Sequence, residues 1–232
     1  MPRTRRPGAV LALVVAVVAG ASACSSSKAA AAQLPAAAGL FTAAEQAMRD
    51  VKTVHATIDV VGTISGLLLH RADVQLTREG KAKGTGVIEE SGQPVEVQFV
   101  IVGSTLYLKG PTGGYQQLPL ALASTVYDPS AVLDPDRGVV RLLATAGGAR
   151  TEAAEAVDGQ QAYRVAFSPA DAVMKVLVPG VGTGATAEVW VAAGSKRLLK
   201  AVFTLPATSL GKGGTATIRF TDYDQPVTIN AP

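Results

Sequence analysis

The chain has 232 residues, with 21 Lys and Arg against 18 Asp and Glu, and its single cysteine excludes an internal disulfide. Arg3, Arg5 and Arg6 account for the whole surplus of three positive charges, so the rest of the chain is neutral. With no cluster of basic residues and only 5% aromatic residues, the composition does not indicate a nucleic-acid-binding surface.

The first segment is typical of an exported lipoprotein. The three arginines precede an apolar run over 10–18, and small residues then lead to Cys24. Because the run is shorter than the ~18 residues that a stable membrane span needs, it predicts a secretion signal over 1–23 that is removed. The order resembles a bacterial lipobox, with Ala21 where lipoboxes usually carry Leu. We expect Cys24 to become the acylated N-terminus, with chains such as palmitate, and to hold the protein on the outer face of the cell membrane, facing the periplasm or cell wall. The alternative is an ordinary secreted protein with a stray cysteine.

After the cysteine, the sequence predicts a tether followed by one domain. The acylated cysteine and an Ala-rich, flexible tether span 24–38, and the domain spans 39–232. Apolar residues at helical spacing predict a helix from Leu40 to Thr53, with Thr42 and Glu45 as a capping box.

From His55 onward the apolar residues recur at every second position, which predicts strands with one buried and one solvent-exposed face. Glycines fall between the runs as the turns of an antiparallel meander should. The early runs are centred on Ala56–Val60, Ala72–Leu76, Val95–Ile101 and Leu106–Leu108.

The middle of the chain predicts short helices. Asp128-Pro129, Asp134-Pro135 and Ser168-Pro169 each place a capping residue before a proline, the arrangement that starts a helix. Strands resume around these helices, and 198–205 is apolar on both faces, as expected of a covered central strand. The fold class is therefore α+β: nine or ten antiparallel strands in a curved sheet whose concave face is covered by short helices.

Small inward side chains in such a sheet predict a hydrophobic cavity able to hold acyl chains. A well-packed core is the alternative, and the absence of any void that could hold a fatty tail would favour it. Gly86→Trp or Val97→Trp is expected to block the cavity. The predicted lining consists of Ile58, Val60, Val74, Leu76, Gly86, Ile88, Val97, Phe99, Ile101, Leu106, Leu142, Val165, Phe167 and Val189.

Four groups of residues carry a resemblance to a known family. They are Val54-His55-Ala56, the segment from Tyr127-Asp128-Pro129 through Val132-Leu133-Asp134-Pro135-Asp136 to Gly138, Val157-Asp158-Gly159-Gln160, and Val189-Trp190-Val191. In order and along nearly the whole chain after Cys24, they resemble the LppX/LprAFG family of mycobacterial cell-envelope lipoproteins. The motifs mark helix starts and turns, not a reactive group.

The resemblance implies a curved half-barrel like the periplasmic lipoprotein carriers. Its cavity would hold the chains of triacylated glycolipids, of the phosphatidylinositol mannoside or lipoarabinomannan type, or triacylglycerol, for transport across the envelope. The implied partners are a major-facilitator efflux transporter and Toll-like receptor 2, with the protein itself a monomer. Gly86 stands where the family has a larger aliphatic residue, which predicts either a wider hollow or a bulge.

Two other classes of function find little support in the sequence. There is no G-x-S-x-G motif, and His55 and His70 lie near strand starts without a recognisable nucleophile, so we expect no enzyme. Asp134–Gly138 resembles a calcium loop only superficially, and Asp222-Tyr223-Asp224 is expected to be a solvated strand end, so no metal or cofactor is predicted. A structural or signalling envelope lipoprotein with a solid core remains the alternative.

Overall fold

The computed structural model describes residues 33–232 apart from 65–66, 124–130, 179–180 and 209–210. Residues Leu34–Pro232 form one compact unit that contains the whole described core. Cys24 and Tyr127–Ser130 therefore lie outside the described residues. Within them, no helix is long and apolar enough to cross a membrane.

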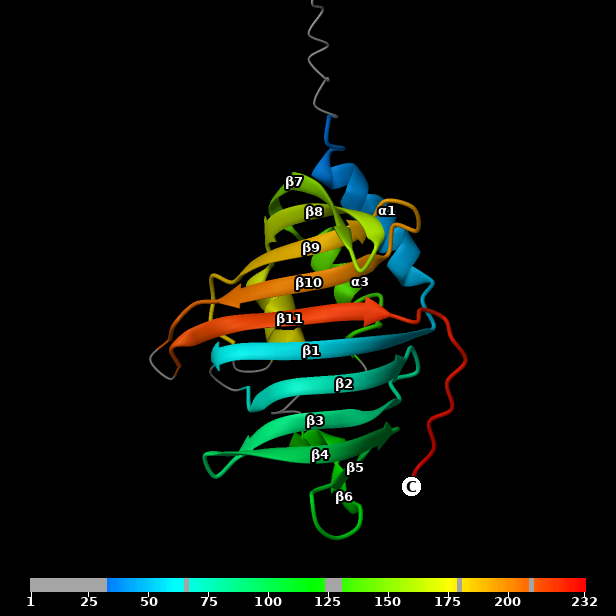
Figure 1. Cartoon of the computed structure of the whole chain (residues 1–232), viewed down its shortest axis with the longest axis vertical. Helices are drawn as coiled ribbons and strands as arrows, with labels where there is room; N and C mark the ends of the chain where they lie inside the picture. Colours follow the sequence, from blue (N-terminus) through cyan, green and yellow to red (C-terminus); the bar gives the residue numbers. More distant parts are fainter. Residues whose placement is uncertain (1–32, 65–66, 124–130, 179–180, 209–210) are drawn as a thin grey trace, which may run out of the picture. The chain divides into compact units, whose positions relative to one another are not determined.

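Eleven described strands form one antiparallel sheet (Figure 1). Its order is β6-β5-β4-β3-β2-β1-β11-β10-β9-β8-β7, so the first and last strands pair at its centre and join two meanders. The strands are β1 (Thr53–Thr63), β2 (Leu69–Thr77), β3 (Ala82–Glu90), β4 (Gln93–Val102), β5 (Thr105–Lys109), β6 (Gln116–Pro119), β7 (Gly147–Val157), β8 (Gln160–Ser168), β9 (Thr186–Ala192), β10 (Leu198–Leu205) and β11 (Gly213–Thr221).

The four described α-helices are α1 (Ala37–Arg49), α2 (Leu120–Ala123), α3 (Val139–Ala144) and α4 (Asp171–Leu177). We call the sheet face that bears Ala56, Ile58 and Val60 the inner face. The meander from β1 to β6 ends at one edge of the sheet, and β7 begins at the other edge. The chain must cross between the two edges, and this crossing brings α3 over the inner face, while α4 reaches the same face between β8 and β9. These crossings explain why the helices cover the concave side, as predicted.

The predicted strand alternation is confirmed. In β2 the side chains of Ala72, Val74 and Leu76 are buried, while those of Arg71 and Asp73 are exposed. The same parity passes from strand to strand through the register, because β1 Ala56 is opposite β2 Val74 and β11 Phe220. One face therefore stays apolar across the centre of the sheet.

Helix α1 fills one part of the inner face. Leu40, Ala44 and Met48 are buried, and the Phe41 ring meets Phe167 of β8 edge to face at 5.2 Å. The helix begins at Ala37, three residues before the predicted start, because the alanine run has high helix propensity.

Three of the predicted helix starts need correction. Ser168 is the last residue of β8 and not a cap, since α4 begins at Asp171 with Ala170 at its N-cap position. The capping box at Thr42 and Glu45 is wrong, because both residues lie inside α1 and Ala36 occupies the N-cap position without a side-chain hydrogen bond. Asp134 does accept hydrogen bonds from the backbone N–H groups of Asp136 and Arg137, at 2.8 and 3.1 Å, but it caps only a turn. Helix α3 starts later, at Val139.

The opposite, outer face is polar with one small apolar cluster. Trp190, Leu199 and Val157 belong to that cluster, and the Trp190 indole N–H donates to Glu155 at 2.5 Å. Leu199 and the partly buried Val202 give β10 apolar contacts on its second face, which accounts for the predicted two-sided burial of 198–205.

Candidate binding cavity

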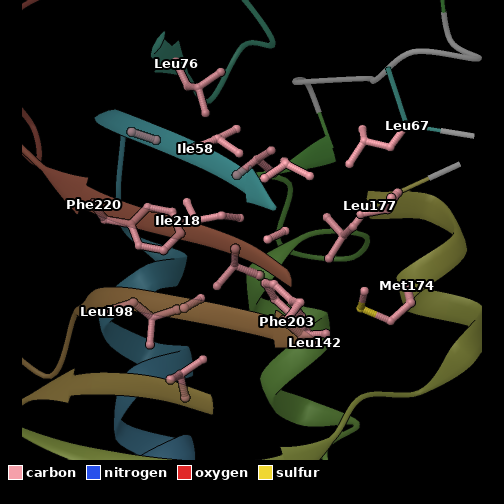
Figure 2. A pocket seen from close by; sticks show the side chains of 18 residues that line it. Ile58, Leu67, Leu76, Leu142, Met174, Leu177, Leu198, Phe203, Ile218 and Phe220 are labelled. Atoms are coloured by element: carbon pink, nitrogen blue, oxygen red, sulfur yellow. The ribbon is translucent and has the colours of Figure 1, made fainter. Parts of the chain in front are cut away.

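An apolar cavity lies between the inner face and its helices (Figure 2). Its volume is about 80 Å³. All of the lining side chains are aliphatic, methionine or phenylalanine, so the cavity offers no directional polar contact. They are Ala56, Ile58, Val60, Leu67, Leu76, Val132, Val139, Leu142, Met174, Leu177, Val178, Val189, Leu198, Ala201, Phe203, Ala216, Ile218 and Phe220.

The register of the central strands positions the floor of the cavity. Ile58 of β1 is opposite Ile218 of β11, which is opposite Ala201 of β10, and all three side chains lie on the inner face. Ala201 is in turn opposite Val189 of β9. Because Ala201 is small and stands between larger neighbours, the floor is hollowed at that point.

The opposite wall, which we call the cover, consists of residues 131–144 and α4. Val132, Val139 and Leu142 reach the cavity from the crossing segment, while Met174 and Leu177 reach it from α4. The crossing segment is fixed by backbone hydrogen bonds, including Val139 N–H to the Val132 carbonyl at 3.0 Å. The cover is therefore two short pieces of chain and not a continuous layer of helix.

Burial of the lining changes from one end of the cavity to the other. Leu142, Val189 and Leu198 are almost completely buried. Leu67 and Leu177 are only partly buried, and Figure 2 places both at the same end of the cavity. Val60, near the C-terminal end of β1, is also partly buried. We infer that the cavity opens toward solvent at the end marked by Leu67 and Leu177. We call this end the mouth.

The closed volume is too small for an acyl chain. A cavity of ~150 Å³ holds one benzene molecule, and 80 Å³ is roughly half of that. Any tail longer than a few carbons must therefore separate the cover from the sheet in order to enter. This volume is the observation that favours the solid-core alternative.

Five of the fourteen predicted lining residues border the cavity: Ile58, Val60, Leu76, Leu142 and Val189. The other strand residues do share the inner face, as the register requires, but they lie elsewhere along it. Val74, Ile101, Val165 and Phe167 are buried in the main core, with Phe99 and Leu106 packed against it, while Gly86, Ile88 and Val97 lie on β3 and β4, away from the described lining.

The structure leaves little room for the wider hollow expected at Gly86. A Cβ atom at this position would lie 3.3 Å from the Arg71 carbonyl oxygen and 3.5 Å from Leu69 Cδ1. The irregularity in this region lies in β2, between Leu69 and Arg71, and not at Gly86 itself. Gly86 and Val97 are therefore poor positions from which to block the cavity.

Sequence reasoning missed the contributions of β10 and β11 and, apart from Leu142, that of the cover. Ile218 had a usable signal, because it falls on the apolar parity of a predicted strand. Ala201 and Phe203 lie in the run that is apolar on both faces, so alternation could not assign them to one face. Leu67 and Val178 had no signal, since they lie just outside regular elements and periodicity says nothing about them.

The ionisable clusters lie away from the cavity lining. The His55 imidazole lies between β2 and β11, with Nε2 2.9 Å from Asp73 Oδ1 and Nδ1 3.0 Å from Thr221 Oγ1. His70 Nε2 lies 3.5 Å from Glu89. Neither histidine contacts a serine or cysteine among the hydrogen bonds of the described residues, and that part of the chain holds no cluster of three or more metal-binding side chains.

Comparison with known proteins identifies relatives along nearly the whole chain. The LppX_LprAFG lipoprotein family model matches residues 36–229. The lipoarabinomannan carrier protein LprG of Mycolicibacterium smegmatis is 31% identical, covering 97% of this chain and 94% of the relative. LprG of Mycobacterium leprae is 30% identical, with coverages of 98% and 96%.

Solved structures show the same fold. LprF from Mycobacterium bovis superposes with a TM-score of 0.71 at 23% identity, covering 84% of this chain and 96% of that one. LppX from Mycobacterium tuberculosis gives a TM-score of 0.65 at 21% identity, with coverages of 84% and 98%. The curved antiparallel sheet with short helices over one face is therefore shared.

Proposed function

Since the chain belongs to the LppX/LprAFG lipoprotein family, we propose that it is a lipid carrier whose inner-face cavity takes up the acyl chains of glycolipids. The observation that carries the proposal is the lining, in which all 18 side chains are apolar. Such a wall recognises tails by their length and number and leaves the headgroup outside.

The names of the relatives narrow the ligand class. Several are lipoarabinomannan carriers, and that name supports a multiply acylated glycolipid of the lipoarabinomannan or phosphatidylinositol mannoside type as cargo here. Triacylglycerol has the same tail chemistry and is the second candidate cargo. The apolar lining alone does not discriminate between them, since the two differ outside the tails.

Energetics support entry of tails despite the small closed volume. A tail of ~14 methylenes gains about 11 kcal/mol on leaving water. Separating the cover exposes the five cover side chains that reach the cavity, at a cost of about 1.5–3 kcal/mol each if none repacks, or about 8–15 kcal/mol together. One tail therefore roughly balances the opening of the cover, and two or three exceed it before ordering costs.

The proposal includes a membrane anchor. We propose that residues 1–23 are removed, that Cys24 is acylated, and that residues up to the start of α1 link the lipid to the domain on the outer side of the membrane. Carriage across the envelope, docking to a major-facilitator transporter and recognition by Toll-like receptor 2 follow from the family resemblance and remain predictions.

Lipid extraction tests the carrier against the solid-core alternative. The compact unit from Leu34 onward, which lacks the anchor cysteine, is purified from a glycolipid-producing actinobacterial host, and its bound lipid is identified by mass spectrometry. The carrier predicts near-stoichiometric glycolipid or triacylglycerol. A lipid-free protein that also takes up no added lipid would establish the solid core.

A further inference from the structure

A second hollow lies on the outer face of the sheet, on the side away from α3 and α4 (Figure 1). It is a groove of about 320 Å³ over β2, β3 and β4, and we call it the outer groove. Asp73 of β2 is opposite Thr85 of β3, and Thr85 is opposite Gln98 of β4, so a row of polar side chains crosses it. The lining residues are Asp73, Gln75, Lys83, Gly84, Thr85, Gln98, Phe99, Val100 and Tyr115.

Two charged side chains of the outer groove are fixed by contacts with the rest of the domain. Asp73 Oδ1 lies 2.9 Å from His55 Nε2, and the Lys83 ammonium donates to the Thr228 carbonyl at 3.1 Å. They are the one acid and the one base of the lining. The lining therefore has no surplus charge of either sign.

The other polar groups of the outer groove are uncharged. The Tyr115 hydroxyl donates to Gln98 Oε1 at 3.4 Å, and the Lys109 ammonium lies 5.9 Å from the centre of the Tyr115 ring, so this ring is held at the side of the groove. Within the described part of the chain, the side chains of Gln75 and Thr85 have no hydrogen-bond partner. An amide and a hydroxyl that can each donate and accept therefore face the groove unused.

These groups match the chemistry of a sugar. A sugar hydroxyl both donates and accepts, as amides and hydroxyls do, and the Tyr115 ring offers an apolar surface to the C–H groups of a sugar ring. A phosphate would require surplus basic side chains, but Asp73 balances Lys83, and beside the groove Glu96 balances Lys109. An acyl chain would require an apolar wall. A peptide added as a strand would require a free sheet edge, and β2, β3 and β4 are each paired on both sides.

We propose that the outer groove binds sugar units of an uncharged glycan. Gln75, Thr85 and Gln98 bind its hydroxyl groups, and Tyr115 packs against a ring. Since a cavity of ~150 Å³ holds one benzene molecule, 320 Å³ has room for about two sugar rings. The glycan is either a free polysaccharide or the head of the glycolipid cargo, and the second source rests on the proposed function. Gln75 is six residues along β2 from Leu69, about 20 Å from the end of the strand near the mouth, so a head of several sugars reaches the groove around this end of the sheet.

Calorimetric titration of the lipid-free Leu34–Pro232 unit tests the outer groove. The ligands are mannotriose, maltotriose and cellotriose, and at least one should bind, with an affinity that changes less than about twofold between low and high salt because the ligand is uncharged. We expect Gln75→Leu with Thr85→Val to weaken this binding at least tenfold. Gln160→Leu with Thr217→Val makes the same exchanges on the outer face outside the groove and should bind like the unmodified unit. Equal affinity of the two variants, or no binding of any of the three sugars, would overturn the proposal.

Fluorescence gives a second readout that does not depend on a loss of binding. Trp190 is the only tryptophan in the sequence and is buried away from the groove, so it provides a constant background. Tyr115→Trp keeps an aromatic ring in the groove, and its emission should change when the bound sugar is added. Gln117→Trp, on β6 outside the lining, should not respond. An equal response of the two variants would contradict a site at Tyr115.

Loading with phosphatidylinositol mannoside distinguishes the two sources of the glycan. If the head of the cargo occupies the outer groove, the loaded protein should bind the free sugar at least tenfold more weakly than the lipid-free protein. Equal affinity would assign the groove to a free glycan. The carrier is tested separately by lipid extraction, because the groove and the cavity lie on opposite faces. A protein that holds lipid but binds no sugar would refute the outer groove alone, and one that binds sugar but holds no lipid would refute the carrier alone.

Discussion

At the level of single residues, a small charged cluster fixes the chain where it leaves β11, the last strand in the sequence. The Asp224 carboxylate accepts from the Lys52 backbone N–H at 2.8 Å and pairs with Arg197. The Arg197 guanidinium lies 5.1 Å from the centre of the Tyr223 ring, and the Tyr223 hydroxyl donates to the Leu198 carbonyl at 2.7 Å. The expected solvated strand end is therefore a clamp between β1, β10 and the chain after β11, and burial raises the pKa of the Tyr223 hydroxyl well above its usual value.

This clamp predicts a measurable acid dependence. Partial burial acts to raise the pKa of Asp224, but the hydrogen bond from Lys52 and the contact with Arg197 outweigh it, so the pKa lies below its usual value. The unfolded chain then binds a proton at Asp224 that the folded protein does not, and stability falls as the pH drops below about 4. We expect Asp224→Asn to lower the free energy of unfolding by about 1 kcal/mol at neutral pH, a figure kept small because the carboxylate is partly exposed.

Urea unfolding of both proteins at several pH values checks this. The difference between the unmodified protein and Asp224→Asn should be largest at neutral pH and shrink in acid. Asp158→Asn, at a solvent-exposed turn, is the control and should change little. A difference that stays constant down to strongly acidic pH would contradict the role given to Asp224.

The cavity itself can be probed one residue at a time through the strand parity. Ile58 lines the cavity from β1, and its neighbour Thr57 lies on the outer face opposite Asp73 and Arg219. Ile58→Trp should fill the space of about 80 Å³ and lower lipid uptake at least tenfold, since a tail and the indole cannot occupy the same place. Thr57→Trp, with the same added ring on the opposite face, should take up lipid normally. Uptake is measured with a fluorescent acyl probe, and equal uptake by both variants would move the binding site elsewhere.

At the level of elements, the cover depends on a glycine that admits no side chain. A Cβ atom at Gly138 would lie 2.1 Å from the Ala131 carbonyl oxygen and 2.2 Å from that of Val132. Gly138→Ala must therefore push residues 131–132 away from the start of α3. We expect it to lower the free energy of unfolding by a few kcal/mol and to speed the exchange of bound lipid.

The matched control for this glycine lies in α1. Gly39 has no atom within 4 Å of its Cβ position, so Gly39→Ala should stabilise the helix by about 0.5–1 kcal/mol and leave lipid exchange unchanged. Thermal unfolding and release of a fluorescent lipid measure the two effects. If Gly138→Ala released lipid no faster than Gly39→Ala, the crossing segment would not be part of the cover that moves.

The helices and strands also show which parts of the fold can be predicted from sequence patterns. Alternation predicted the inner face of β1, β2, β4, β5, β9 and β11, because the two sides of each of these strands differ in polarity. It could not do so for β10, which is apolar on both faces. Strand β6 was missed because Gln116–Pro119 has a single large apolar residue, Leu118, and owes its place to pairing with β5. The helix starts failed where an acid before proline satisfied a turn instead, as at Asp134.

At the level of the whole molecule, the position of the void could not be predicted from periodicity. Alternation identifies which side chains point inward, but a void forms only where the opposite wall fails to fill the space. Phe41 of α1 packs on Phe167, so that part of the inner face is solid. The crossing segment and α4 leave a gap over β1, β10 and β11. Both facts depend on long-range packing, and a local pattern contains no information about it.

A cavity that must widen to admit a tail predicts that bound lipid stabilises the whole domain. A ligand that binds only the folded state at one hundred times its dissociation constant adds about 2.7 kcal/mol. For a domain of this size, each kcal/mol raises the melting temperature by roughly 2–4 °C, so loading should raise it by about 5–10 °C. Delipidated and reloaded Leu34–Pro232 are compared by calorimetry, with Ile58→Trp as the variant that cannot load. A shift in the unmodified protein that Ile58→Trp lacks would tie the stabilisation to the cavity, because lipid bound at the outer surface of the domain would raise both melting temperatures alike. The solid core instead predicts identical melting temperatures with and without lipid.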